Sequence, residues 1–266
     1  MNKMEIALRE LSEMDSLAAQ QSILHRLHPG AKLITTVIFI MTTVSFHKYD
    51  LSGLLPMILW PVLLFQLSGI PMRTCFYKMR IVLPLVMAVG ILNPFFDHRI
   101  VFTAGSISVW GGVVSMITLM LKGVLCLMAS LLLAASTSMD ALCGVLRKWH
   151  VPGMLVTLLL LTYRYVGVLT EEASIMTDAY HLRAPGQKGI HISAWGSFLG
   201  QLLLRSMDRA QQLYASMLLR GYHEHFHYAE IQQFRVKDAI YIIACVGLCL
   251  VMRFIPVVWV LGRIVT

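Results

Sequence analysis

Long runs of apolar residues, broken by short polar connections, dominate the pattern of hydrophobic and polar positions along this chain. Each run approaches the roughly 20 residues that a helix needs to cross a bilayer. Prolines within the second and last runs do not argue against helices, because neighbouring groups in a membrane protein satisfy the freed carbonyls. The pattern predicts an all-α polytopic membrane protein with about five transmembrane helices, four within residues 31–137 and one within 238–266. The runs cover residues 33–46, 51–67, 81–96, 113–135 and 238–261.

The polar connections between these runs indicate how the chain is oriented. Between Gly69 and Arg80 the connection carries Arg73, Lys78 and Arg80 and no acidic residue. Because cytoplasmic segments collect Lys and Arg, this connection and the amino terminus are predicted to face the cytoplasm. Residues 1–30 mix apolar and charged positions without a signal-peptide core, which favours an amphipathic lead-in at the membrane surface. The connection after the third run is expected to turn at Gly105.

The segment 138–237 is too polar to span lipid along its whole length, so we expect a cytoplasmic helical domain. Its helices are predicted at about 138–150, 154–184 and 194–221. The second helix starts with an apolar half, gains charge along its length and stops at Ala184, Pro185 and Gly186. In the third helix, apolar residues step by threes and fours from Leu199 to Gly221, which is typical of an amphipathic helix.

Composition supports the membrane prediction. Hydrophobic residues make up 57% of the 266 residues and charged residues only 14%, where a soluble domain has about a quarter charged. The formal net charge of +8 could indicate nucleic acid binding in a soluble protein. In a membrane protein it mainly reflects the basic cytoplasmic segments, so we expect no nucleic acid partner. The five cysteines form no CxxC pair and are expected to act as small buried hydrophobic residues.

Motifs for nucleotide hydrolysis are absent from the sequence. Gly186 to Gly189 lack the spacing and the Ser or Thr of a P-loop, and no GxSxG occurs. We therefore expect no enzyme activity or cofactor in this chain, with ATP and Mg²⁺ bound by partner subunits. His223, His225 and His227 are weak metal-site candidates, because alternating positions share one side only on an extended strand. With Glu224 and Glu230 they would support the alternative of an integral-membrane, metal-dependent hydrolase.

Two cations fall within the apolar runs, Lys122 and Arg253. A lone ammonium in lipid costs several kcal/mol unless it is paired or reaches the interface, so Lys122 is expected to make a contact within the bundle. Both could also mark the transport path of a stand-alone secondary carrier. Against that alternative, the chain shows no inverted repeat of related halves.

The ends of the two long predicted helices carry a resemblance to a known family. Each has an arginine between small or apolar residues, as Leu182-Arg183-Ala184 and Leu219-Arg220-Gly221. With further stretches they make the chain resemble the T component, the transmembrane energy-coupling subunit, of an energy-coupling factor (ECF) transporter, in its CbiQ-like cobalt and nickel branch. The resemblance covers residues from about 15 to 235. The further stretches are residues 24–33, 136–140, 161–172 and 205–222.

The resemblance implies a bacterial inner-membrane importer for cobalt or nickel, in which this chain is the scaffold. Its partners would be two ABC ATPases and a small substrate-binding membrane subunit, with an accessory membrane subunit in some assemblies. A T component of a vitamin transporter is the alternative within the family. The family's usual Ala-Arg-Gly signature is altered here by Leu182, Ala184 and Leu219, while both arginines are kept. The resemblance assigns ATPase coupling to Arg183, Arg220 and the residues flanking each, and assigns support of the coupling helices to Arg164, Glu171, Arg205, Asp208 and Arg209.

Overall fold

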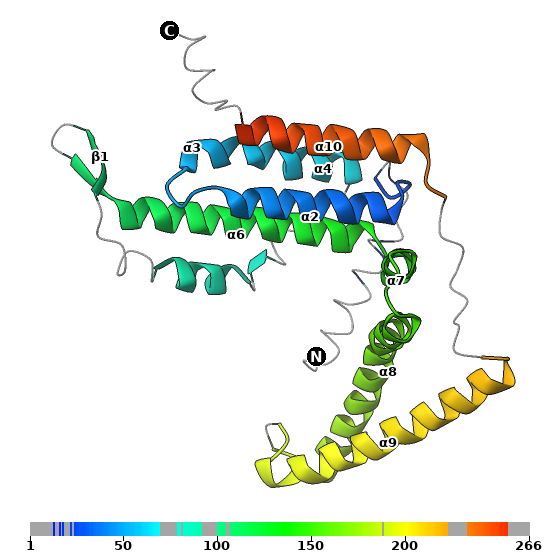
Figure 1. Ribbon diagram of the computed structural model, residues 1–266. Coiled ribbons are helices and arrows are strands. Elements are labelled where there is room, and N and C mark those ends of the chain that lie inside the picture. Colours follow the sequence, from blue (N-terminus) through cyan, green and yellow to red (C-terminus); the bar gives the residue numbers. More distant parts are fainter. Residues whose placement is uncertain are drawn as a thin grey trace. The chain divides into compact units, whose positions relative to one another are not determined.

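The computed structural model describes residues 24–69, 79–80, 82–91, 100–104, 107–187, 189–222 and 233–254, together with Glu13, Ser16, Ala18 and Ser22. The chain divides into two compact units, one of residues 1–16 and 138–231 and one of residues 17–137 and 232–266. The described parts of both units are mainly helical, as Figure 1 shows, so the predicted all-α polytopic membrane fold is confirmed. The labelled elements are α2 (Pro29–Ser45), α3 (Leu51–Leu54), the 3-10 helix η1 (Leu55–Ile58), α4 (Leu59–Ser68), β1 (Ile100–Ala104), β2 (Ile107–Trp110), α6 (Gly111–Ser136), α7 (Met139–Lys148), α8 (Gly153–Arg183), α9 (Ile192–Leu219) and α10 (Val236–Phe254).

Three stretches of helix in the described residues are long and apolar enough to cross a membrane. The first runs from Leu51 to Ser68 through α3, η1 and α4, and the others are α6 and α8. The 3-10 turn of η1 starts beside Pro56, which cannot donate a backbone hydrogen bond. Shorter apolar helices are α2 and the helix Val82–Ile91. The last predicted run forms α10, which carries Lys237, Asp238 and Arg253.

The hairpin of β1 and β2 differs from the expected simple turn at Gly105. Its strands pair antiparallel, from Ala104 opposite Ile107 to Ile100 opposite Trp110. The β-branched and aromatic residues of this stretch, such as Val101, Phe102 and Val109, favour strand pairing over a loop. The prediction missed the strands because it treated the segment only as a connection between two apolar runs.

The helix α2 lies at the centre of the unit of residues 17–137 and 232–266, which is called the membrane unit below. Figure 1 shows α2 lying between α10 and α6, and both neighbours pack along it. Its buried Phe39 stacks on Trp60 of α4 with ring centroids 4.2 Å apart. Leu125, Ala129 and Leu132 of α6 are buried in the same core, one helical turn apart. Burial of side chains from α2, α3, η1, α4, α6 and α10 in one cluster holds this unit together.

The helix α6 also approaches the helix Val82–Ile91 closely, at Gly123. A Cβ atom at Gly123 would lie 2.6 Å from Cγ1 of Val86, on the helix Val82–Ile91. No side chain fits at that distance, so the two backbones can approach only because position 123 is glycine. Small residues serve the same purpose in membrane bundles generally.

Hydrogen bonds to the backbone anchor both ends of α2. At its amino end, the Asp238 carboxylate accepts from the N–H of His28 at 2.8 Å and from the N–H of Arg235 at 2.8 Å. The Lys32 ammonium, close enough to be attracted by Asp238, donates to the carbonyl of Ser136 at 2.7 Å. These contacts join the start of α2 to the start of α10 and to the end of α6.

At the carboxyl end of α2, two cations satisfy carbonyls that have no partner within the helix. The Lys122 ammonium of α6 donates to the carbonyls of Val44 at 3.1 Å and Phe46 at 2.5 Å. The Arg253 guanidinium of α10 donates to the carbonyl of Ser45 at 3.1 Å and lies over the Phe46 ring. Positive charge at a helix carboxyl end also stabilises the helix dipole. The two intramembrane cations of the sequence therefore act as caps of one helix.

The other unit begins with α7 and the first part of α8. Ser138 caps α7 by accepting from the N–H of Ala141. The helix ends with His150 in the left-handed region at φ 63°, while the N–H of Val151 reaches back to the carbonyl of Leu146. Cys143 is fully buried against Val156 and Leu160 of α8. That burial, with a smaller effect of the Asp140 carboxylate, raises the pKa of the Cys143 thiol, so it stays protonated at neutral pH.

We predict that Asp238→Ala lowers the free energy of unfolding by about 3 kcal/mol. The change removes the acceptor of the buried His28 N–H and of the half-buried Arg235 N–H, and it removes the charge that opposes Lys32. Thermal unfolding of the full chain in mild detergent, followed by tryptophan fluorescence, measures the loss. The control is Asp178→Ala, which removes an exposed carboxylate from α8 and should change stability by less than about 0.5 kcal/mol. Equal effects of the two variants would show that Asp238 does not anchor α2.

Candidate functional site

The candidate site consists of α8, α9 and their ends, which are called the coupling tips and comprise Leu182–Ala184 and Leu219–Gly221. Both helices lie in one unit and diverge from the loop that joins them (Figure 1). The described α8 covers residues 153–183, close to the predicted 154–184, and α9 covers 192–219 instead of 194–221. The start of α9 two residues earlier than predicted follows from His191, whose ring nitrogen accepts from the N–H of Ser193 at 3.4 Å.

The first coupling tip presents its side chains to solvent. Leu182 is 84% exposed, and Arg183 is exposed without an ion-pair partner among the described residues. The N–H of Ala184 makes the last helical bond, to the carbonyl of Tyr180 at 3.0 Å. Gly186 then turns the chain at φ 91°, a conformation that favours glycine. The Pro-Gly stop read from the sequence therefore ends α8 beside an exposed leucine and arginine.

The second coupling tip is closed by a hydrogen-bonded cap. The N–H of Gly221 bonds the carbonyl of Leu218 at 2.9 Å, and the N–H of Tyr222 bonds the carbonyl of Met217 at 3.0 Å. With Gly221 at φ 79°, this is a Schellman motif, in which glycine avoids the strain of the left-handed conformation. The cap fixes the direction in which Arg220 leaves α9. Leu219, just before it, is 91% exposed.

The supporting residues expected from the sequence lie at different places along the helices. Arg205 of α9 forms an ion pair with Glu172 of α8, not with the neighbouring Glu171, which is exposed. A step of one residue turns a side chain by about 100° around a helix, so only Glu172 faces α9. Asp208 and Arg209 are exposed on α9. The structure brings Arg205 to α8 and leaves Asp208 and Arg209 facing solvent.

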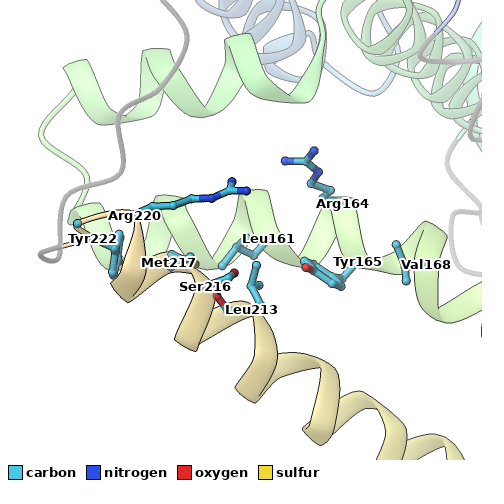
Figure 2. Close-up of a pocket in the computed structure, with 10 residues that line it drawn as sticks. Leu161, Arg164, Tyr165, Val168, Leu213, Ser216, Met217, Arg220 and Tyr222 are labelled. Carbon is cyan, nitrogen blue, oxygen red and sulfur yellow. Dashed lines mark hydrogen bonds between the residues drawn. The ribbon is translucent and has the colours of Figure 1, made fainter.

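Arg164 lies in a cleft between α8 and the end of α9, together with Arg220. The cleft has a volume of about 490 Å³, and Figure 2 shows the two guanidinium groups directed toward one another. The family resemblance placed Arg164 among the residues that support the coupling helices. Its position next to Arg220 was not predicted, because the two arginines are far apart in sequence and no local pattern relates them.

The loop between α8 and α9 is held by one tyrosine. The Tyr180 hydroxyl donates to Oε1 of Gln187 at 2.8 Å and accepts from the N–H of His191 at 3.4 Å. It therefore ties the last turn of α8 to the residue that caps α9. Sequence analysis did not single out Tyr180, although an aromatic residue with a polar end close to a Pro-Gly stop is a recognisable signal.

The remaining candidates are Lys122 and three histidines. Lys122 belongs to the membrane unit, where it caps α2. His223, His225 and His227 lie outside the described residues. Within the part of the chain that the structure describes, no group of three His, Cys, Asp or Glu side chains could hold a metal ion.

We predict that Tyr180→Phe speeds amide hydrogen exchange of the loop residues 184–191 about fivefold, since one hydrogen-bonded link worth about 1 kcal/mol is lost. Exchange measured by mass spectrometry on peptides covering the loop gives the rate. Tyr214→Phe removes a hydroxyl from an exposed position of α9 and serves as the control. Unchanged exchange in Tyr180→Phe would mean that the hydroxyl does not restrain the loop.

Comparison with known proteins gives consistent matches along most of the chain. Residues 20–228 match the model of the CbiQ family, described as cobalt transport protein. The chain is 37% identical to the cobalt transport protein CbiQ of Rhodobacter capsulatus, over 34% of this chain and 37% of that protein. It is 25% identical to the energy-coupling factor transporter transmembrane protein EcfT of Bacillus subtilis, over 76% of this chain and 81% of that protein. An uncharacterised protein of Methanocaldococcus jannaschii is 22% identical over 83% of this chain and 78% of its own length.

Proposed function

This chain belongs to the CbiQ family of cobalt transport proteins, and we propose that it acts as the T component of an ECF-type importer. In this role it would transmit movement of partner ATPases to a substrate-binding membrane subunit. The relatives named as energy-coupling factor transporter transmembrane proteins support the assignment. The two coupling tips carry the proposed coupling role.

The observation that carries the proposal is the exposure of both coupling tips. A leucine that is 84% or 91% exposed at a helix end gains nothing in the isolated chain and is suited to a partner's apolar groove. Each leucine stands next to an arginine, whose planar guanidinium can bind a carboxylate through two hydrogen bonds. Apolar burial and charge recognition are thus combined at both tips.

The separation of the tips suits two partner subunits. Arg183 precedes the loop that leads into α9, and Arg220 follows the end of that helix. The 28 residues of α9 span on the order of 40 Å, so one small protein groove could not hold both tips. Two ATPases that close on each other would move the tips together. Long helices are stiff enough to carry that movement, because their backbone hydrogen bonds run along the axis.

We further propose cobalt or nickel as the imported substrate, captured by the small membrane subunit, sometimes with an accessory one. The name of the matching family favours cobalt, while a vitamin remains the alternative within ECF transporters. In the proposed topology about five helices cross the bacterial inner membrane, and the amino terminus and the coupling tips face the cytoplasm. The partner ATPases bind ATP and Mg²⁺. The metal held by the copurified membrane subunit, measured by elemental analysis, identifies the substrate.

A metal-dependent hydrolase is the second hypothesis, through His223, His225 and His227. It predicts a transition metal bound by this chain in the absence of any partner. The family assignment favours transport, and no observation on the described residues favours hydrolysis.

We predict that the double variant Arg183→Glu/Arg220→Glu loses ATPase association by more than about 100-fold. Each reversal removes a bidentate contact and introduces repulsion against the same carboxylate. Coexpression with the partner ATPases, capture of this chain in mild detergent and quantification of the bound ATPase by mass spectrometry give the result.

The matched control is Lys148→Glu/Lys237→Glu, which makes the same change of net charge at exposed positions outside the tips. This control should retain the ATPases to within about threefold. A full complex with the double arginine variant would refute the coupling role of the tips.

A further inference from the structure

The cleft between α8 and the end of α9 has two chemically distinct parts. Apolar side chains from both helices line it, together with Arg164 and Arg220, whose guanidinium groups are directed toward one another (Figure 2). The Tyr165 side chain also lines it. The apolar side chains are Leu161, Val168, Leu213 and Met217.

The two guanidinium groups face no opposing charge from the residues that the structure describes. Among the described residues neither Arg164 nor Arg220 has an ion-pair partner, and Glu172, the nearby acid of α8 that faces α9, is paired with Arg205. Two like charges directed toward one another repel, and the repulsion is removed when an anion lies between them. Arginine is the side chain best suited to hold a phosphate in this way, through its planar fork of donors.

The cleft lies where α8 changes from apolar to polar. Residues 153–161 include no charged side chain, whereas Arg164, Glu171 and Glu172 follow. A helix with this pattern, and with tyrosines at the change, places that change at the boundary between hydrocarbon and head groups. The phosphate groups of phospholipids occupy the same level.

An exposed apolar stripe leads from the cleft along α8. Leu161, Tyr165 and Val168 line the cleft, and Leu158 and Met154 continue the same helical face at spacings of three and four residues. Leu158 is 61% exposed and Met154 is 83% exposed. The stripe from Met154 to Leu161 is roughly 10 Å long, enough to contact part of an acyl chain. A free phosphate ion would leave this stripe unexplained.

We propose that this cleft binds an anionic phospholipid, with its phosphate between Arg164 and Arg220 and an acyl chain along the stripe of Leu158 and Met154. The proposal rests on the chain being a membrane protein and describes the chain without bound ATPases, since Arg220 cannot hold the lipid phosphate and an ATPase carboxylate at the same time. Bound there, the lipid joins α8 to the end of α9 by charge at a place where the two helices have no ion pair of their own. It also neutralises the repulsion that would otherwise separate them.

The test uses the full chain, purified in a nonionic detergent without ATPases and titrated with phosphatidylglycerol, while native mass spectrometry counts bound lipid. Phosphatidylcholine with the same acyl chains tests the need for net negative charge. We expect phosphatidylglycerol to bind about tenfold more tightly than phosphatidylcholine. We expect Arg164→Gln to weaken the binding of phosphatidylglycerol about tenfold relative to the wild type. Arg209→Gln, an exposed position of α9 outside the cleft, should stay within about twofold of the wild type.

Several results would overturn the proposal. Equal binding of the two lipids would show that net negative charge is not recognised. If Arg209→Gln weakened phosphatidylglycerol binding as much as Arg164→Gln, the lipid would be attracted only diffusely to a basic surface. Displacement of phosphatidylglycerol by inorganic phosphate at similar concentration would assign the cleft to a free anion. Absence of lipid binding, with ATPase association weakened by Arg164→Gln, would assign it to an acidic segment of a partner protein.

A second variant keeps the test valid if Arg164→Gln does not fold. Ser216→Phe places a ring in the cleft without changing charge, and should also remove phosphatidylglycerol binding. Unchanged binding in a folded Ser216→Phe protein contradicts the proposed site. Because lipid binding is measured without ATPases, its failure leaves the coupling role untouched. Loss of coupling in a variant of Arg183 alone, which lies outside the cleft, leaves the lipid result untouched.

Discussion

The membrane unit depends on polar groups that anchor the two ends of one helix. Apolar side chains alone do not fix how helices align in a bilayer, because lipid tails are as apolar as the side chains they would replace. Asp238 and Lys32 anchor the start of α2, and Lys122 and Arg253 anchor its end. Each anchor involves backbone groups that have no partner within their own helix, so a shift of α10 or α6 along α2 by one turn would expose several of them at once.

The directions of the helices follow from the same contacts. Lys32 near the start of α2 meets Ser136 at the end of α6, while Lys122 meets the end of α2, so α2 and α6 run antiparallel. Asp238 and Arg253, near the two ends of α10, meet the start and end of α2 in the same order, so α2 and α10 run parallel. Charged residues that look unfavourable in an apolar run thus define the topology of the bundle.

Local signals in the sequence predicted what depends on local structure. Apolar run length predicted the membrane helices, the Pro-Gly stop after Arg183 predicted the end of α8, and Gly221 predicted the cap of α9. Interactions between distant residues were not predictable in the same way. The pairing of Arg205 with Glu172, the capping of α2 by Lys122 and the cleft of Arg164 and Arg220 each depend on which helix faces which, and a single sequence carries no direct signal of that. The hairpin of β1 and β2 was missed for another reason, because membrane patterning hid the β-branched and aromatic residues that favour strands.

The two coupling tips share a sequence pattern but differ in how they are supported. Arg220 leaves α9 through a hydrogen-bonded cap and lies in a cleft whose other wall is α8, so a force on Leu219 and Arg220 acts on both helices. Arg183 stands at the end of α8 before a turn that Tyr180 ties to the start of α9, so a force there acts through that turn. Under the proposed function, the ATPase at the second tip moves the body of the α8–α9 pair, and the ATPase at the first tip moves its connecting end. Opposite ends of one pair of helices then respond to the two halves of a closing dimer, which turns closure into rotation of the pair rather than simple translation.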